Sequence, residues 1–153
     1  MDKVAAIERI EMDKVTALER IRAARTKKGI SYEELGKAIG TKNPTYIAAV
    51  LYGQHRLNTE EAQKLARAVE VDLETALATT AMPLRTEFPL TTDPFKYRLL
   101  ELVGVYGDAL REQCNELFGD GILSDIDCTV KIEKRGERAL LTVDSKFLHY
   151  KEY

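Results

Sequence analysis

The 153-residue sequence lacks tryptophan and contains only four prolines, nine glycines and two cysteines. So few helix breakers, with 44% apolar and 31% charged residues, exclude a collagen-like or disordered chain. The length predicts one compact domain or two small ones. Cys114 and Cys128 lack the neighbouring ligands of a metal site, so we expect both to be small buried groups in a reducing compartment.

The sequence also lacks a strong excess of charge of one sign. Its 23 basic and 25 acidic side chains give a net charge of −2, which argues against a protein that binds phosphate backbones or anionic membranes. No apolar run approaches the roughly 20 residues that span a bilayer, and the first residues carry too many charges for a secretory signal. We therefore expect a cytoplasmic protein with no nucleic-acid and no membrane partner.

The pattern of apolar and polar residues divides the chain near Pro83. Residues 1–82 have helical patterning, whereas the tail from about Asp125 alternates apolar and polar residues. The stretch from Pro83 to Thr92 is the expected linker. The sequence therefore predicts an α+β, mostly helical fold, with a helical domain at residues 1–82 and a second domain at residues 83–153.

An internal repeat opens the sequence, because MDKVAAIERI at residues 1–10 recurs as MDKVTALERI at residues 12–21 with eight of ten positions identical. Its eleven-residue period is about three helical turns, so Val15, Leu18 and Ile21 share a face with their counterparts in the first copy. The pattern predicts one long amphipathic helix or two stacked pieces. The repeat is either an added helix for oligomerisation or packing, or else a recent duplication or an alternative start at Met12 that frays in solvent, and we favour the second reading.

Three short helices are expected next, each opened by a capping residue. Ser31 has Glu34 three positions on, Asn43 precedes a proline, and Thr59 precedes two glutamates. Helices of this length and spacing resemble the helical domain of phage repressors, in which the second and third helices form a helix-turn-helix. A DNA-binding regulator is therefore one candidate function.

The expected third helix is poorly suited to reading DNA. A recognition helix needs polar donors toward the base edges and basic neighbours on the phosphates, yet no charged residue lies within residues 43–54. Its candidate face, made of Tyr46, Ala48, Ala49 and Tyr52, is better suited to packing against another subunit. A helix-turn-helix DNA-binding regulator stays an alternative function, as does a non-catalytic oligomeric scaffold.

After the linker, a helix of about 25 residues is expected, from Asp93 as N-cap and Pro94 to the glycines at 119–121. Apolar residues recur along it at intervals of three and four and predict a core stripe. The stripe comprises Leu99, Leu102, Val103, Tyr106, Leu110, Cys114 and Leu117. Arg98 and Glu101 lie three residues apart and therefore share one face beside the stripe.

A β-hairpin is expected at the C-terminal end. Alternation from Ile126 to Ile132 predicts one strand, residues 134–137 a turn, and Ala139 to Val143 the returning strand. A two-stranded ribbon is marginal in water, so we expect the hairpin to pair with a second copy or to pack on the long helix. The pattern predicts an oligomer.

Three strings carry a resemblance to a known family: PLR at 83–85, TDPFKYRLLELVGVYG at 92–107 and FGDGILSDID at 118–127. With these strings at these spacings, the chain from about Ser31 to Leu148 resembles the cyanate hydratase (cyanase) family. The tail departs from the family pattern, having Ser145 where Gly is usual and His149 where Pro is usual. The resemblance implies a carbon–nitrogen lyase that decomposes cyanate to ammonia and carbon dioxide, dependent on bicarbonate, through a carbamate-like intermediate.

The resemblance also implies which residues act and how the protein assembles. It implies catalytic roles for Arg98, Glu101 and Ser124, no metal, and no cofactor other than bicarbonate as co-substrate. It further implies a homodecamer of five dimers with active sites built between subunits. Ser124 follows a glycine turn, where its hydroxyl and nearby backbone N–H groups can orient a bound anion.

The residue types fit that chemistry. Two unit charges 4 Å apart repel by about 4 kcal/mol at an effective dielectric of 20, so two anionic substrates need a nearby positive charge. Residues 1–80 carry 13 basic and 12 acidic side chains and residues 81–153 carry 10 and 13, so that charge must be local, at Arg98. Glu101 either orients Arg98 or transfers a proton, and we favour orientation. We expect His55 and His149 to have no catalytic role.

Overall fold

A computed structural model describes residues 3–40, 42–84 and 92–151, and for residues 3–12 it describes the backbone alone. The chain divides into two compact units. The helical unit comprises Met1–Thr86 and Lys131–Glu133, and the helix–hairpin unit comprises Glu87–Val130 and Lys134–Tyr153. Most of the expected linker lies outside the described residues, and a domain boundary after residue 82 stays a prediction.

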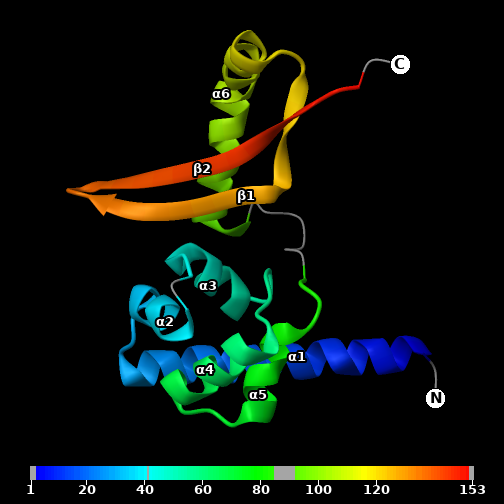
Figure 1. Cartoon of the computed structure of the whole chain (residues 1–153), viewed down its shortest axis with the longest axis vertical. Helices are drawn as coiled ribbons and strands as arrows, with labels where there is room; N and C mark the ends of the chain where they lie inside the picture. Colours follow the sequence, from blue (N-terminus) through cyan, green and yellow to red (C-terminus); the bar gives the residue numbers. More distant parts are fainter. Residues whose placement is uncertain (1–2, 41, 85–91, 152–153) are drawn as a thin grey trace. The chain divides into compact units, whose positions relative to one another are not determined.

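The helical unit is a bundle in which one long helix contacts most of the others (Figure 1). Its described elements are α1 (Lys3–Lys28), α2 (Tyr32–Ile39), α3 (Pro44–Leu51), α4 (Thr59–Val69), α5 (Leu73–Leu77) and the 3-10 turn η1 (Ala78–Thr80). Helix α2 packs on α3 and α4, while α1 packs on α3, α4, α5 and η1. The predicted helical bundle is confirmed.

Apolar side chains from α1 to α4 meet in one core. The buried members are Leu18, Ile21, Leu35, Ile39, Ile47, Val50, Leu51, Leu57, Leu65 and Val69. Because fully burying one such side chain is worth about 1.5–3 kcal/mol, this cluster is the main source of the unit's stability.

From Lys3 on, the repeat forms one continuous helix, α1, which joins the two copies. In the second copy Leu18 and Ile21 are buried, whereas Val15 is 44% exposed. Lys14 is buried as well, and its Nζ donates a hydrogen bond to the carbonyl of Met82 at 2.5 Å. Burial lowers the pKa of Lys14. The second copy is therefore part of the packed unit, while the side chains of the first copy lie outside the described residues.

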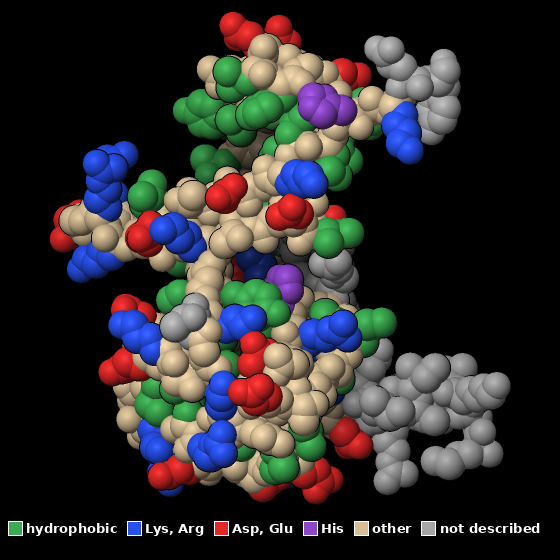
Figure 2. All heavy atoms as spheres, in the orientation of Figure 1, with side chains coloured by type: hydrophobic (Ala, Val, Ile, Leu, Met, Phe, Trp, Pro, Cys, Tyr) green, Lys and Arg blue, Asp and Glu red, His purple; other side chains and the backbone are tan. Residues whose placement is uncertain are grey.

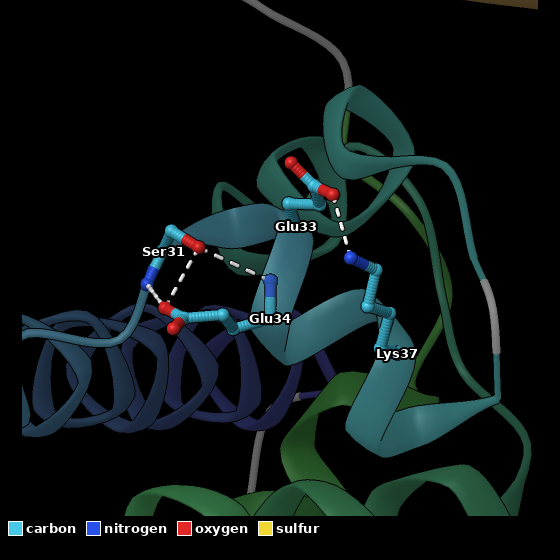
Figure 3. Close-up of polar contacts among 4 residues, drawn as sticks. All are labelled: Ser31, Glu33, Glu34 and Lys37. Carbon is cyan, nitrogen blue, oxygen red and sulfur yellow. Dashed lines mark hydrogen bonds and ion pairs between the residues drawn. The ribbon is translucent and has the colours of Figure 1, made fainter.

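The capping box predicted at Ser31 is present at the start of α2 (Figure 3). The Ser31 Oγ accepts a hydrogen bond from the Glu34 N–H at 3.1 Å, and the Glu34 carboxylate accepts one from the Ser31 N–H at 2.8 Å. One turn along, Lys37 donates to Glu33 at 2.7 Å. The two hydrogen bonds between Ser31 and Glu34 satisfy N–H groups that a helix start leaves without partners.

The cap predicted for α3 is confirmed and the one for α4 is wrong by one residue. Asn43 Oδ1 accepts from the Thr45 N–H at 2.9 Å. The cap of α4 is Asn58, whose Oδ1 accepts from the Glu61 N–H at 2.9 Å, and Thr59 is the first helical residue. Asn and Thr are both good caps, so only the backbone geometry distinguishes two such neighbours.

The helix–hairpin unit contains α6 (Pro94–Phe118), β1 (Gly121–Arg135) and β2 (Arg138–His149), and its described strands form a two-stranded sheet. Helix α6 has the predicted limits, with Asp93 as N-cap and Gly119 ending it. The hairpin turn is shorter than predicted, because Gly136, with φ +61°, and the next residue make a tight two-residue turn. Strand β2 begins one residue earlier than predicted and continues to His149, beyond the predicted end at Val143.

The apolar stripe of α6 has the predicted period, but the prediction that it is buried is wrong for the single chain. No described residue of α6 is buried, and Leu102, Leu110 and Leu117 are 51%, 62% and 74% exposed. Part of the stripe lines an apolar hollow of about 750 Å³ between α6 and the hairpin. Figure 2 shows apolar side chains gathered over this unit. Two strands are too few to cover the helix.

Candidate functional site

The first candidate pair, Arg98 and Glu101, lies near the start of α6. The helix begins at Pro94 because the Asp93 carboxylate accepts hydrogen bonds from the N–H groups of Phe95 and Lys96. Residues three apart on a helix are neighbours. The guanidinium of Arg98 donates from Nη1 to Oε2 of Glu101 at 2.6 Å, so the predicted contact is formed.

The pair leaves most of the Arg98 guanidinium available. The side chain of Arg98 is 68% exposed and that of Glu101 is 44% exposed. The guanidinium carbon of Arg98 also lies 5.7 Å from the centroid of the Tyr97 ring. A guanidinium has five N–H donors in a planar fork, which suits it to a small oxyanion. Arg98 is a permanent positive charge held in place by Glu101.

Ser124 lies in β1 rather than in a loop and is only 8% exposed. Its Oγ accepts hydrogen bonds from the N–H groups of Ile126 at 3.2 Å and Asp127 at 2.9 Å. These two amides therefore bind the serine itself, and the binding of an anion at Ser124 stays a prediction. The Ser124 hydroxyl proton has no acceptor among the described residues, so this side chain is suited to donate a hydrogen bond.

The single chain brings together two of the three candidate residues. Arg98 and Glu101 are in contact, whereas the described residues contain no hydrogen bond from Ser124 to either of them. Residues close in sequence to the Arg98–Glu101 pair and to Ser124 line the apolar hollow. They are Leu99, Leu102, Ile122 and Leu123.

The sequence prediction missed Ser145 as part of this region. Its Oγ donates a hydrogen bond to the backbone carbonyl of Ser124 at 2.6 Å. The signal available in the sequence was the departure from the family pattern at this position. The sequence alone does not show that Ser145 lies beside Ser124, because that contact depends on how β1 and β2 pair.

The cysteines and histidines lie outside this set of contacts. Both cysteines are free thiols and are half-buried, not buried as expected, and Cys114 lines the apolar hollow. His55 packs on the Tyr46 ring, and His149 packs edge-on against Phe147.

In the described ranges no group of three or more His, Cys, Asp or Glu side chains is arranged to hold a metal ion. Nor does any helix there have both the length and the apolar character needed to cross a membrane.

Helix α3 is the recognition helix in the alternative function, a DNA-binding regulator. Little of its candidate face is exposed. Tyr46, Ala48 and Ala49 are half-buried, and Tyr46 donates from its hydroxyl to the carbonyl of Arg56 at 2.7 Å. Tyr52 is 61% exposed. Tyr52 is thus the most accessible member of this face, and packing of the face against another subunit stays a prediction.

Basic residues from other segments do reach α3, which the sequence did not indicate. The Arg22 guanidinium carbon lies 4.6 Å from the centroid of the Tyr52 ring. Arg22 also donates to the carbonyl of Leu51 at 2.5 Å, and Lys42 pairs with Glu61 at 3.0 Å. Both cations thus have partners within the unit, which does not favour a surface that binds phosphates.

Known proteins share both units. Residues 89–152 match the family model of the cyanate lyase C-terminal domain, and residues 21–75 match a helix-turn-helix model. The cyanate hydratase of Pseudomonas putida is 40% identical over 138 residues, which cover 87% of this chain and 94% of that protein. The cyanate hydratase of Coprinopsis cinerea is 39% identical over 138 residues, covering 85% and 91%.

A solved structure agrees with these relatives. The crystal structure of cyanase from T. urticae matches with a TM-score of 0.82 and 33% identity, covering 88% of this chain and 97% of that one. A helix-turn-helix type of helical unit joined to a cyanate lyase helix–hairpin unit therefore defines the class of protein. The chain belongs to the cyanate hydratase family, which confirms the resemblance, and the alternative of a DNA-binding regulator is not favoured.

Proposed function

We propose that the chain is a cyanate hydratase, which converts cyanate, bicarbonate and two protons to ammonia and two molecules of carbon dioxide. A bicarbonate oxygen bonds to the cyanate carbon while the nitrogen takes up a proton. The adduct then releases one carbon dioxide and leaves a carbamate. Cleavage of the carbamate C–N bond, with proton transfer to nitrogen, releases ammonia and the second carbon dioxide.

The observation that carries the proposal is the Arg98 guanidinium, held by Glu101 at 2.6 Å and otherwise open, in a segment that matches the cyanate lyase domain. Two anions close together repel by about 4 kcal/mol at an effective dielectric of 20. A fixed guanidinium offsets that repulsion and holds both reactants at bonding distance, which replaces a costly bimolecular encounter. Because the net charge is −2, this attraction has to be local.

The other two residues support Arg98. Ser124, with its lone pairs occupied by two backbone N–H groups, donates its proton to one anion and orients it. Glu101 orients Arg98, because its carboxylate is already paired and an unpaired one would repel both substrates. The chemistry needs proton transfers and no electron transfer, so it requires no redox cofactor. The proposal includes no metal and no organic cofactor.

The working enzyme in this proposal is a homo-oligomer, a decamer of five dimers, with sites completed between subunits. The occupant of the apolar hollow is a second copy of the chain, since the exposed stripe of α6 and a lone two-stranded sheet both need a partner surface. Assembly also accounts for the lack of a bond between Ser124 and the Arg98–Glu101 pair in one chain. The free cysteines fit a cytoplasmic location.

Ammonia release from cyanate, with and without bicarbonate, tests the proposal. Wild type should release ammonia only when bicarbonate is present. Arg98→Ala should lower kcat/KM at least about a hundredfold, the usual loss when a donor to developing negative charge is removed. Lys96→Ala, which removes another cation from α6, is the matched control and should behave like wild type.

Absent or bicarbonate-independent turnover by wild type would contradict the proposal. Retention of DNA that weakens steeply with salt would instead support the regulator.

A further inference from the structure

The end of α6 meets the end of β2 through two stacked aromatic rings. Phe118 is the last residue of α6, and its ring centroid lies 5.1 Å from that of Phe147 in β2, with 22° between the ring planes. Two rings at this separation attract each other beyond the area that they bury. Among the described aromatic side chains, this stack is the ring contact that joins α6 to the hairpin.

Gly121 lets the Phe147 ring and the end of β2 approach the backbone of β1. The glycine is buried, and a Cβ built on it would lie 2.7 Å from Cε1 of Phe147 and would collide with the carbonyl oxygen of Leu148. Only a residue without a side chain fits so close an approach. The Tyr150 N–H also donates to the carbonyl of Asp120 at 3.3 Å. The end of β2 is therefore fixed along the turn that follows α6.

The rest of the single chain fixes the direction of α6 only weakly. No described residue of α6 is buried, and a hollow of about 750 Å³ lies between the helix and the strands. The connection from Phe118 to β1 consists of Gly119, with φ +84°, and Asp120. Glycine adopts such backbone angles freely, so this short connection alone leaves the helix able to swing. The stack of Phe118 on Phe147 is the contact that limits the swing.

The stack lies far along the helix from Arg98, so a small tilt at Phe118 has a large effect. With a rise of about 1.5 Å per residue, the stretch from Arg98 to Phe118 is about 30 Å long. A tilt of about 2° at Phe118 therefore moves Arg98 by about 1 Å. In an assembly of identical chains every copy has the same angle, so the tilt moves Arg98 relative to Ser124 whichever copies supply the two residues.

We propose that Phe147 is a positioning residue, which fixes the angle between α6 and the hairpin. That angle sets where the Arg98–Glu101 pair lies relative to Ser124. The inference rests on the proposed function, in which these three residues act on the same anions. Phe147 acts through Phe118, and its effect on the reaction is geometric, because a misplacement of about 1 Å can cost about a hundredfold in rate.

Three variants of the full chain test the proposal. Phe147→Leu keeps an apolar side chain but removes the ring, whereas Phe147→Tyr keeps the ring. His149→Leu is the matched control, because it removes the neighbouring ring of β2, which packs on Phe147 rather than on α6. We expect Phe147→Leu to lower kcat/KM for cyanate about ten- to a hundredfold. Phe147→Tyr should stay within about threefold of wild type, and His149→Leu should match wild type.

Crystal structures of wild type and Phe147→Leu provide a readout that needs no cyanate. With the hairpins superposed, the guanidinium carbon of Arg98 should be displaced by about 1 Å or more in the variant, while the oligomer mass stays as in wild type. An unmoved Arg98, a smaller oligomer mass, or an equal loss of activity in His149→Leu would overturn the positioning role. If wild type releases no ammonia from cyanate, the proposed function itself fails, and that result is distinct from an unmoved Arg98.

Discussion

Arg98 and Glu101 form an ion pair whose side chains are 68% and 44% exposed, so water and salt screen their attraction. Exposed pairs of this kind contribute about 0.2–1 kcal/mol to stability. The 2.6 Å contact favours the orientation of the flexible Arg98 side chain in which its guanidinium lies beside Glu101. At the residue scale, the value of the pair lies in orientation.

The role of Glu101 can be tested by Glu101→Gln. We expect kcat/KM for cyanate to fall about tenfold or more, with most of the change in KM, because Arg98 loses its charged partner and binds anions in a less fixed position. The thermal midpoint should stay close to wild type, since an exposed pair contributes little. Steady-state kinetics and thermal unfolding measure both quantities.

Unchanged turnover in Glu101→Gln would mean that the charge is dispensable. A loss confined to kcat, with a changed pH profile, would favour proton transfer by Glu101 over orientation.

At the scale of a single element, the stability of α2 depends on hydrogen-bond partners for the backbone groups at its ends. It has eight residues, fewer than a helix needs to be stable alone. The Ser31 capping box supplies partners for its first N–H groups, and packing of Leu35 and Ile39 in the core supplies the rest of its stability. The hydrogen bonds from Ser31 lower the pKa of Glu34, which makes this helix start sensitive to acid.

Glu34→Gln isolates the charge of the capping box, because glutamine keeps the acceptor oxygen. A carboxyl whose pKa is lower in the folded state stabilises the protein above its unfolded pKa, here near 4.5, and loses that effect as pH falls through the folded pKa. The stability difference between wild type and variant should therefore be largest above about pH 5 and vanish in stronger acid. Urea midpoints between pH 3 and 7 measure it.

The exposed Glu19→Gln on α1 is the control for a general loss of negative charge. A difference for Glu34→Gln that persists unchanged at the lowest pH would contradict the assigned cause.

At the scale of the whole molecule, the two units differ in what covers their apolar residues. The helical unit has its own buried core, whereas α6 has no buried residue among those described. Monomeric proteins rarely leave so large a contiguous apolar surface to water. The helix–hairpin unit is therefore the part of the chain that needs a partner, and the proposed partner is a second copy.

Leu110→Glu tests that proposal. Leu110 is 62% exposed in the single chain and lines the hollow, and glutamate is a good helix former, so α6 should still form. Burying a charge at a subunit contact is costly, so we expect a smaller particle mass and a loss of activity of at least tenfold. Sedimentation measures the mass.

Leu73→Glu, at another exposed apolar residue (46%) in the first turn of α5, is the control and should keep the wild-type mass. An unchanged mass for Leu110→Glu would contradict the proposed contact.

Local features were predicted well and long-range ones were not. The limits of α6 follow from Asp93, Pro94 and Gly119, which act on their own neighbours. The cap of α4 was misplaced because Asn58 and Thr59 can both serve. The hydrogen bond from Ser145 to the Ser124 carbonyl depends on which residues of two strands meet, and alternation within one strand carries no such information.

The sequence by itself determined the family, the two-part organisation of helices and hairpin, and the Arg98–Glu101 contact, because a spacing of three on a helix makes residues neighbours. Only the tertiary structure decided that Ser124 is nearly buried with two backbone amides on its hydroxyl, and that Ser145 reaches it from β2. It also decided that the stripe of α6 is exposed in one chain. Burial and cross-strand contact depend on what packs against a residue, and that lies outside any local stretch of sequence.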